Sequence, residues 1–399
     1  MKYNSGLLLL LCLAVVSCSS FDTPMYATIE STSLVLSPTW APSATPSLAS
    51  STQTSTCTPA ETAYFPIKGC RPRFISRDVV MYGVPSLSSD GEWLAFACST
   101  NDEYFLCNMR IDGTELQQIV SLGSWFPYPV WSPIDNVIAI SKRTSVDNSG
   151  SSIWDLYLIS PDGTVIRKLT DNPAQAGAIL SNIQWSPDGQ WIAFVAPGHI
   201  GAERSSVYII RADGSGLQQL TYPPSFDTSP RWSPDGTRLA YLAESPSVRY
   251  LVIETESWDS RAKQQYPLEI SGDLSWSPDG IGIIYISDRS NNFDLYFFDL
   301  IQNEETRLTF DPGVDIDPVW SPDGSMILFR SNRSGRYELY TMHGPGNEIV
   351  RQVENATFDF LMNPFWSRDG DSIYFFLANN LKDLYELWVV DTMEACEEF

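Results

Sequence analysis

The sequence predicts an all-β protein, a seven-bladed β-propeller whose blades each contain four antiparallel strands. A motif built around Trp, Pro, Asp and Gly recurs seven times along the chain, with a mean spacing near 46 residues. That spacing is typical of one propeller blade. The segments between the motifs are rich in β-branched and aromatic residues and show no helical periodicity. Aromatic residues make up 13% of the chain, and 24 Gly and 27 Pro supply turns, so the composition favours many short strands.

The repeats are clearest between Gln184 and Phe329. Four copies are nearly identical in pattern: QWSPDGQWIAF at Gln184, RWSPDGTRLAY at Arg231, SWSPDGIGIIY at Ser275 and VWSPDGSMILF at Val319. Three weaker copies complete the set: LSSDGEWLAF at Leu87, VWSPIDNVIAI at Val130 and FWSRDGDSIYF at Phe365. Radial repetition of this kind indicates a propeller.

Each repeat can be divided into four strands. Ser-Pro-Asp-Gly suits a tight turn because Pro restricts φ, Asp bonds its own backbone and Gly accepts a positive φ, so it predicts a hairpin between the first two strands. A third strand follows, as in DLYFFD at Asp294 and ELYTMH at Glu338. A shorter edge strand then ends the unit, as in RKLT at Arg167 and TRLT at Thr306. We expect the repeated Trp residues to pack one blade against the next.

The N-terminus has the features of a targeting segment. Lys2 supplies a positive charge, and Leu7 to Val16 form an apolar core that is too short to anchor a protein across a bilayer. The sequence Val15-Val16-Ser17-Cys18 resembles the lipobox of bacterial lipoproteins, which implies that Cys18 is lipidated and begins the mature chain. An ordinary secretory signal is the alternative.

The chain is expected to have three parts. Residues 1–17 form the signal peptide, residues 18–63 a tether and residues 64–399 the propeller. Residues 19–60 contain 10 Ser, 9 Thr and 5 Pro, a composition that favours an extended or disordered linker. The resulting expectation is an extracytoplasmic protein that is held to the bacterial membrane, in the periplasm or at the cell surface, through its N-terminal lipid alone.

The repeat also resembles a known family. The pattern Trp-Ser-Pro-Asp-Gly-x-x-Ile-Ala-Phe, then Ile-Tyr-x-x-Asp, then Leu-Thr resembles the propeller repeat of TolB, the periplasmic member of the Tol–Pal system, over roughly residues 75 to 395. Similar repeats occur in the propellers of prolyl oligopeptidase-like peptidases. TolB resembles a six-bladed propeller with an added α/β domain, so seven repeats and a tether depart from it, and a Tol–Pal role is not implied.

Ring closure and disulfides can both be anticipated. After Glu386 the last repeat lacks a fourth strand, and the segment from Arg73 to Gly83 is apolar enough to supply it. Cys98 and Cys107 flank the loop between the second and third strands of blade one, which predicts a cross-strand disulfide. A second bridge between Cys70 and Cys396 is favoured, with Cys57 to Cys396 and Cys57 to Cys70 as alternatives.

Several kinds of chemistry are disfavoured. A formal charge of −23 argues against nucleic acid as a partner. No Gly-x-Ser-x-Gly motif occurs, and we expect no hydrolase domain. The only two histidines, His199 and His343, are assigned to loops on opposite faces and cannot share a metal. Three carboxylates of one loop could attract Ca²⁺, but they do not form a recognisable calcium loop: Asp311, Asp315 and Asp317. We therefore expect neither a metal nor another cofactor.

The candidate binding residues lie on loops rather than in the repeat. Aromatic residues that do not recur fall in the connections between blades, where Arg and Asp side chains join them on one face of the ring. The predicted rim site comprises Trp125, Phe126, Tyr128, Phe226, Asp227, Arg289, Asp315, Arg333 and Phe358.

These residues predict a binding protein. The favoured function is non-enzymatic binding of a protein, peptide or glycan by a monomeric propeller at its rim and channel mouth. An enzyme, such as a glycan lyase or hydrolase that uses rim carboxylates, is the first alternative, and a purely structural cell-surface protein is the second. A pair of channel carboxylates with one raised pKa would favour the enzyme.

Overall fold

A computed structural model of the chain describes most of the region that follows the tether. The described residues are 73–79, 81–100, 103–123, 128–146, 152–171, 180–197, 205–221, 226–244, 249–255, 258, 263–344, 349–353, 360–379 and 384–392. Within these ranges every regular element is a β-strand, and none is a helix that could cross a membrane.

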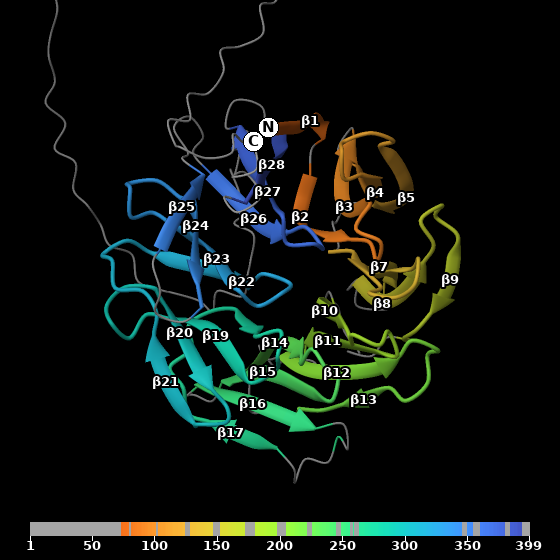
Figure 1. The fold of residues 1–399 in the computed structure, drawn as a ribbon. Coiled ribbons are helices and arrows are strands. Elements are labelled where there is room, and N and C mark those ends of the chain that lie inside the picture. The colour runs from red at the N-terminus through yellow and green to blue at the C-terminus, as the bar shows by residue number, and fades with distance from the viewer. Residues whose placement is uncertain are drawn as a thin grey trace, which may run out of the picture.

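Twenty-eight strands form seven antiparallel sheets of four strands, arranged as blades around a centre (Figure 1). The fold is therefore the seven-bladed β-propeller that the repeats predict. The strands of blades one to three are β2 (Met81–Leu87), β3 (Trp93–Thr100), β4 (Glu103–Arg110), β5 (Gln117–Gly123), β6 (Val130–Trp131), β7 (Ile138–Val146), β8 (Ser152–Ile159), β9 (Val165–Lys168), β10 (Ser181–Trp185), β11 (Trp191–Pro197), β12 (Ser205–Arg211) and β13 (Gln218–Gln219).

The second half of the ring repeats the same order from the inner to the outer strand. The strands of blades four to six are β14 (Phe226–Trp232), β15 (Arg238–Glu244), β16 (Arg249–Thr255), β17 (Gln264–Tyr266), β18 (Leu274–Trp276), β19 (Gly282–Ser287), β20 (Asp294–Asp299), β21 (Glu304–Arg307), β22 (Asp315–Trp320), β23 (Met326–Ser331), β24 (Glu338–His343) and β25 (Ile349–Val353). Blade seven contains β26 (Phe360–Trp366), β27 (Ser372–Asn379), β28 (Leu384–Asp391) and β1 (Arg73–Val79).

Blade seven closes the ring with strands from both ends of the chain. Its order is β1-β28-β27-β26, so the N-terminal strand is the outer strand of the final blade, as predicted. The predicted segment, which ran from Arg73 to Gly83, was too long. β1 ends at Val79, and the residues from Met81 onward pair with β3 as the inner strand of blade one. The closing strand therefore passes directly into the first blade.

The Ser-Pro-Asp-Gly turns are held by their own side chains. In blade six, Ser321 Oγ donates a hydrogen bond to Asp323 Oδ1 at 2.6 Å, and the Ser325 amide donates to the same oxygen at 3.0 Å. The Gly324 amide donates to the Ser321 carbonyl, and Gly324 has a φ of 76°, which favours glycine. These bonds lower the pKa of Asp323 below its ordinary value of 3.8.

The same turns also touch one another around the ring. A Cβ added to the turn glycine of one blade would lie 3.5 to 3.7 Å from the ring of the turn proline in the preceding blade. Four such pairs are described: Pro187 with Gly236, Pro234 with Gly280, Pro278 with Gly324, and Pro322 with Gly370. At the closure, Arg368 replaces proline and lies next to Gly91 of blade one. The repeated motif thus serves contacts between blades as well as its own turn.

Four of the repeated tryptophans form a second set of contacts between blades. The indole Nε1 of Trp276 donates to the Arg231 carbonyl of the preceding inner strand at 3.0 Å. Three other blades repeat this hydrogen bond, through Trp185 to Val130, Trp232 to Gln184 and Trp366 to Val319. The predicted role in blade-to-blade packing is therefore confirmed, and a hydrogen bond accompanies it.

The Leu-Thr ending of the outer strands has a structural cause. In blade five, Thr309 Oγ1 donates to Asp294 Oδ1 at 3.3 Å and accepts the Leu295 amide at 3.0 Å. Arg307 completes the set with an ion pair of 2.8 Å to Asp294, whose side chain is fully buried. Blade two repeats the arrangement with Asp155, Lys168 and Thr170. The acid that begins the third strand is therefore a structural residue.

The core lies between the blades. Apolar side chains of adjacent sheets interlock, and the cluster at the closure joins Leu94 and Phe96 of blade one to Phe376 and Leu387 of blade seven. A disulfide links Cys98 on β3 to Cys107 on β4 in this cluster, with a Cα–Cα distance of 5.9 Å, in agreement with the sequence. Cys18, Cys57, Cys70 and Cys396 lie outside the described residues, as do the signal and tether.

Candidate binding face

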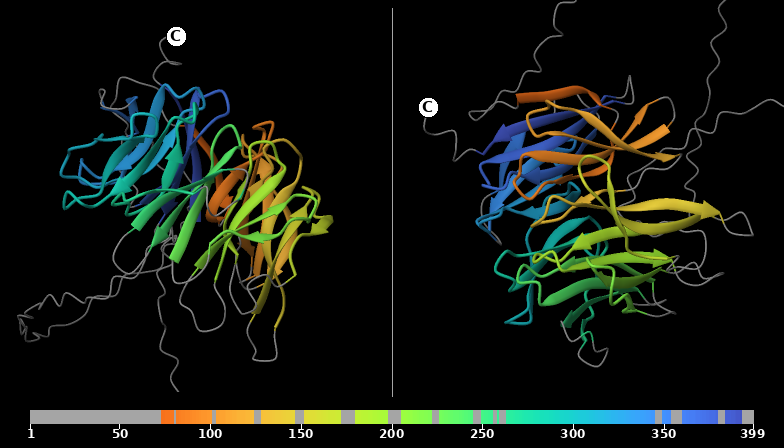
Figure 2. Two further views of the ribbon diagram at one scale, coloured as in Figure 1. Left: turned by 90° about the horizontal axis from the view of Figure 1, so that it is seen from below. Right: turned by 90° about the vertical axis from the view of Figure 1, so that its right-hand side faces the viewer.

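The antiparallel order of the strands divides the loops between two faces of the ring. Strands run from one face to the other, as the side views show (Figure 2). The connections between blades and the loops between second and third strands share one face, here called the rim face. The Ser-Pro-Asp-Gly turns and the turns between third and fourth strands lie on the opposite face.

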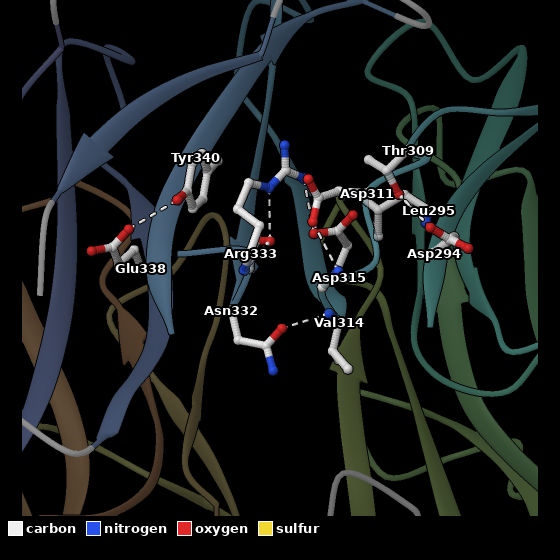
Figure 3. A network of polar contacts seen from close by, with 12 residues as sticks. Asp294, Leu295, Thr309, Asp311, Val314, Asp315, Asn332, Arg333, Glu338 and Tyr340 are labelled. Carbon is white, nitrogen blue, oxygen red and sulfur yellow. Dashed lines mark hydrogen bonds and ion pairs between the residues drawn. The ribbon is translucent and has the colours of Figure 1, made fainter. Parts of the chain in front are cut away.

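On the rim face, hydrogen bonds join the connection between blades five and six to two loops. Asn292 Nδ2 donates to the carbonyls of Asp311 and Gly313, at 2.9 and 2.5 Å. The Val314 amide donates to Asn332 Oδ1 at 2.6 Å (Figure 3). At Gly313 an added Cβ would lie 2.7 Å from the Arg333 backbone, so only glycine permits this approach. The connection is thus held rigidly in place.

Below this connection lies an ion pair. Asp315, at the start of β22, has no solvent exposure, and its Oδ1 accepts a hydrogen bond from Arg333 Nη2 at 3.0 Å (Figure 3). Arg333 Nε donates to Ser331 Oγ at 2.9 Å. The Arg333 guanidinium lies 4.7 Å from the ring centroid of Tyr340, close enough for a cation–π contact. Burial, followed by a hydrogen bond to Glu338, raises the pKa of Tyr340 to about 12, so its hydroxyl stays protonated and donates.

Two exposed aromatic side chains accompany this network. Phe310 is 69% exposed and lies in the same connection, and Phe293 is 36% exposed in the loop before β20. The Arg307 guanidinium lies 4.8 Å from the Phe310 ring centroid, and Arg307 also binds Asp294, so Phe310 is supported from one side. We call Phe293, Phe310 and Asp311, together with the supporting ion pair of Asp315 and Arg333, the rim patch.

Sequence reasoning missed both aromatic residues of the rim patch. Phe310 follows Leu-Thr at the end of an outer strand, in the same position as Tyr222 after QQLT. That shared position was the available signal. Phe293 begins no motif and precedes a structural acid, so its exposure could not be distinguished from ordinary strand packing.

A second charged set lies on or next to the two inner strands of blades four to six, with one member on β23. Arg231 Nη2 lies 3.2 Å from Asp273 Oδ1, and Arg330 forms an ion pair with Asp317. All four side chains are between 16% and 27% exposed. Burial raises the pKa of Asp273, Arg231 lowers it, and the charge of Asp317 raises it further. Asp317 has a φ of 54° at a bulge in β22, which disrupts the pairing with β23.

The predicted rim residues differ in how far the structure exposes them. Asp227, like Asp315, has no exposure, and Arg333 is 16% exposed, so these groups support the surface rather than form it. Arg289 forms an ion pair with Glu305, and its guanidinium lies 3.7 Å from the Tyr296 ring centroid. Tyr128 is half-buried just before β6, and Phe226 begins β14. Three predicted residues lie outside the described residues: Trp125, Phe126 and Phe358.

The candidate metal ligands are separated. Asp315 and Asp317 each pair with an arginine, and Asp311 Oδ1 accepts the Gly313 amide. Over the described ranges no three His, Cys, Asp or Glu residues are grouped so that they could hold a metal ion. His343 ends β24 and is exposed, whereas His199 lies outside the described part of the chain.

Comparisons with known proteins agree with this architecture. Residues 243–393 match the family model of the TolB beta propeller domain. An uncharacterized protein of Agrobacterium fabrum is 31% identical over 114 residues, which cover 28% of this chain and 38% of that protein. The Tol-Pal system protein TolB of Anaeromyxobacter dehalogenans is 30% identical over 128 residues, which cover 32% of this chain and 26% of TolB. The matches thus span well under half of either relative.

Among solved structures, puromycin hydrolase aligns with a TM-score of 0.59 and 18% identity, over 79% of this chain and 53% of that one. This likeness concerns the fold alone. Seven sheets in a closed ring, with the repeated motif at each hairpin, agree with the family match. Residues 243–393 are thus similar to a TolB beta propeller domain, and the chain folds as a closed ring of seven blades.

Proposed function

We propose that this protein is a non-enzymatic binding protein that captures a protein or peptide through the rim patch. The observation that carries the proposal is the 69% exposure of Phe310, in a connection held by hydrogen bonds on both sides. A large apolar side chain in this position contributes nothing to the core. Aromatic anchors on pre-organised loops, with arginine and aspartate nearby, are typical of binding hot spots.

The acidic character of the chain favours a partner of opposite charge. With a formal charge of −23, long-range attraction would speed association with a basic protein and repel nucleic acid. The TolB relative is named as part of the Tol–Pal system, and a protein partner is consistent with that relationship. Trp125, Phe126 and Phe358, which follow blades one and six in the sequence, stay further candidates for binding.

The proposed setting is the cell envelope. Lipidation of Cys18 would anchor the mature protein outside the cytoplasmic membrane. A tether of about 45 residues would have a root-mean-square reach of roughly 35 to 40 Å, enough to keep the rim patch clear of the lipid headgroups. We propose that a monomer acts in this way.

Photo-cross-linking in living cells tests the proposal. A photoreactive phenylalanine analogue replaces Phe310 in one strain and Ile301 in another. Ile301 is also 69% exposed but lies in the turn between β20 and β21, on the opposite face of the same blade. We expect one defined protein adduct from position 310 and none from position 301. Equal labelling at both positions, or none at 310, would refute binding at the rim patch.

One observation favours an enzyme as a second candidate. Burial, and to a smaller extent the charge of Asp317, raises the pKa of Asp273, as expected for a general acid. Both carboxylates are paired with arginines, which favours a structural role. If the protein cleaves glycans and Asp273→Asn abolishes the activity while the fold is retained, the enzyme proposal replaces binding.

A further inference from the structure

A surface cavity lies at the boundary between blades four and five and shares no residue with the rim patch. Its volume is about 430 Å³, which is within the usual size range of small-molecule sites. Its lining includes Tyr266, Glu269, Arg289, Phe298, Asn303 and Glu305. We call it the blade-five cavity.

The polar side of the blade-five cavity is a fixed network. Arg289 pairs with Glu305 at 2.5 Å, and the buried Tyr285 hydroxyl donates to the same carboxylate. Burial raises the pKa of Tyr285, and the bond to Glu305 raises it further, so Tyr285 remains a donor. Burial lowers the pKa of Arg289, but its bonds to Glu305 and Tyr296 outweigh this and raise it, so Arg289 stays charged.

The repeat itself does not require this network. The strand registers place apolar residues at the positions of Tyr285 and Glu305 in two other blades. These pairs are Ile140 and Val165 in blade two, and Phe329 and Ile349 in blade six. The repeated fold therefore does not require this polar pair, and in blade five it holds the Glu305 carboxylate at the surface.

In blade four, the polar side chains at the same positions surround a buried carboxylate. Tyr241 and Lys263 occupy the corresponding positions, and both contact Glu254, which is 1% exposed. In blade five, by contrast, Arg289 and Glu305 are each about a quarter exposed and line the cavity. Arg289 and Glu305 can therefore contact a ligand without a rearrangement, whereas Glu254 cannot.

The charges and surfaces of the blade-five cavity select the chemistry of its ligand. Glu269 and Glu305 repel anions, while Arg289 repels cations, so an uncharged polar molecule is favoured. Glu305 retains free lone pairs as an acceptor, and Asn303 offers both a donor and an acceptor. Tyr266, packed edge-to-face on Phe298 with ring centroids 4.9 Å apart, supplies an apolar surface. A saccharide combines hydroxyl groups with an apolar C–H face.

We propose that the blade-five cavity is a carbohydrate-binding site for a neutral mono- or disaccharide. The proposal is independent of the rim patch, because the two sites share no residue. In it, Glu305 and Asn303 bind sugar hydroxyls, Arg289 orients Glu305, and Tyr266 contacts the sugar ring. The role assigned to Arg289 thereby moves from the rim to this cavity.

Saccharide titration of the full-length protein tests the site. The probes are glucose, galactose, N-acetylglucosamine, maltose, lactose and chitobiose, followed by saturation-transfer NMR and calorimetry. We expect at least one probe to bind, and we expect Glu305→Gln to weaken it at least tenfold. The matched control is Glu304→Gln, the same charge change at an exposed neighbouring position that does not line the cavity.

Two controls separate loss of saccharide binding from failure of the rim proposal and from loss of folding. Phe310→Ala should leave saccharide binding unchanged, so failure of the rim proposal and failure of this one remain distinguishable. Comparable melting temperatures of the two glutamine variants would show that lost binding is not lost folding. The proposal is overturned if no probe binds at millimolar concentration, or if Glu305→Gln binds as tightly as Glu304→Gln.

Discussion

Several side chains in this ring bond or contact more than one neighbouring residue. Arg333 neutralises the buried Asp315, contacts the Tyr340 ring and bonds Ser331, while its backbone leaves room only for Gly313. The sequence identified these residues as charged positions in loops. It did not show that they are buried, because a loop pattern does not reveal which side chains the folded loop covers. The outcome for Asp315 and Arg333 is therefore a structural support beneath an exposed aromatic surface.

Removal of Arg333 should destabilise the fold strongly. In Arg333→Ala the fully buried Asp315 carboxylate loses its partner, which typically costs about 3 to 5 kcal/mol in the free energy of unfolding. Arg336→Ala, in the exposed part of the same loop, should cost less than about 1 kcal/mol. Urea unfolding of both variants measures the difference. Equal losses would show that the ion pair adds little.

The turn aspartates predict how stability depends on pH. Hydrogen bonds from Ser321 and Ser325 lower the pKa of Asp323 below 3.8, so the folded state binds this proton less readily than the unfolded state. Its contribution is present above pH of about 4 and is lost as pH falls through the folded-state pKa. In Asp323→Ala, the deficit in unfolding free energy should be constant near neutrality and shrink below pH of about 4. A deficit that grows on acidification would contradict this assignment.

At the level of strands and turns, the repeated motif serves contacts between blades as well as its own hairpin. Proline and glycine of adjacent turns pack together, and tryptophan bonds the preceding inner strand. Local chemistry therefore predicted the hairpins, the four-strand order and the blade number. The bulge at Asp317 and the exact end of β1 were not predictable, because long-range packing against neighbouring strands decides both.

Two of the repeated tryptophans allow the contribution of the interblade hydrogen bond to be measured. Trp276 Nε1 donates to the Arg231 carbonyl, whereas Trp320 Nε1 is buried and has no hydrogen-bond partner among the described residues. Trp276→Phe should therefore cost about 1 kcal/mol more than Trp320→Phe, beyond their shared loss of volume. Thermal and urea unfolding give the two values. A larger loss for Trp320→Phe would mean that packing alone governs these sites.

For the whole molecule, closure depends on one short strand. β1 pairs with β28 through an irregular register, and Arg73 forms an ion pair with Asp391 across the seam. Seven repeats and an incomplete last unit were sufficient to predict this arrangement. The binding surface was less predictable, because Phe310 acquires its exposure from the path of a connection that only the assembled ring defines.

Deletion of the closing strand should open the ring. A variant that begins after Val79 leaves β28 as an unpaired edge, so we expect a lower melting temperature and early proteolysis in blade seven. A variant that begins at residue 64 keeps β1 and should match the full chain. Limited proteolysis with mass spectrometry distinguishes them. Identical protection of both variants would show that β1 is not needed for closure.

In the proposed function, the rim patch binds a protein partner through Phe310. The most direct test is the affinity of the cross-linked partner, once purified, for Phe310→Ala and Ile301→Ala, measured by calorimetry. We predict that Phe310→Ala weakens binding by about 2 kcal/mol, roughly thirtyfold, with an unchanged melting temperature, and that Ile301→Ala binds like the wild type. Equal affinity for all three proteins, or a loss in Ile301→Ala alone, would contradict the claim.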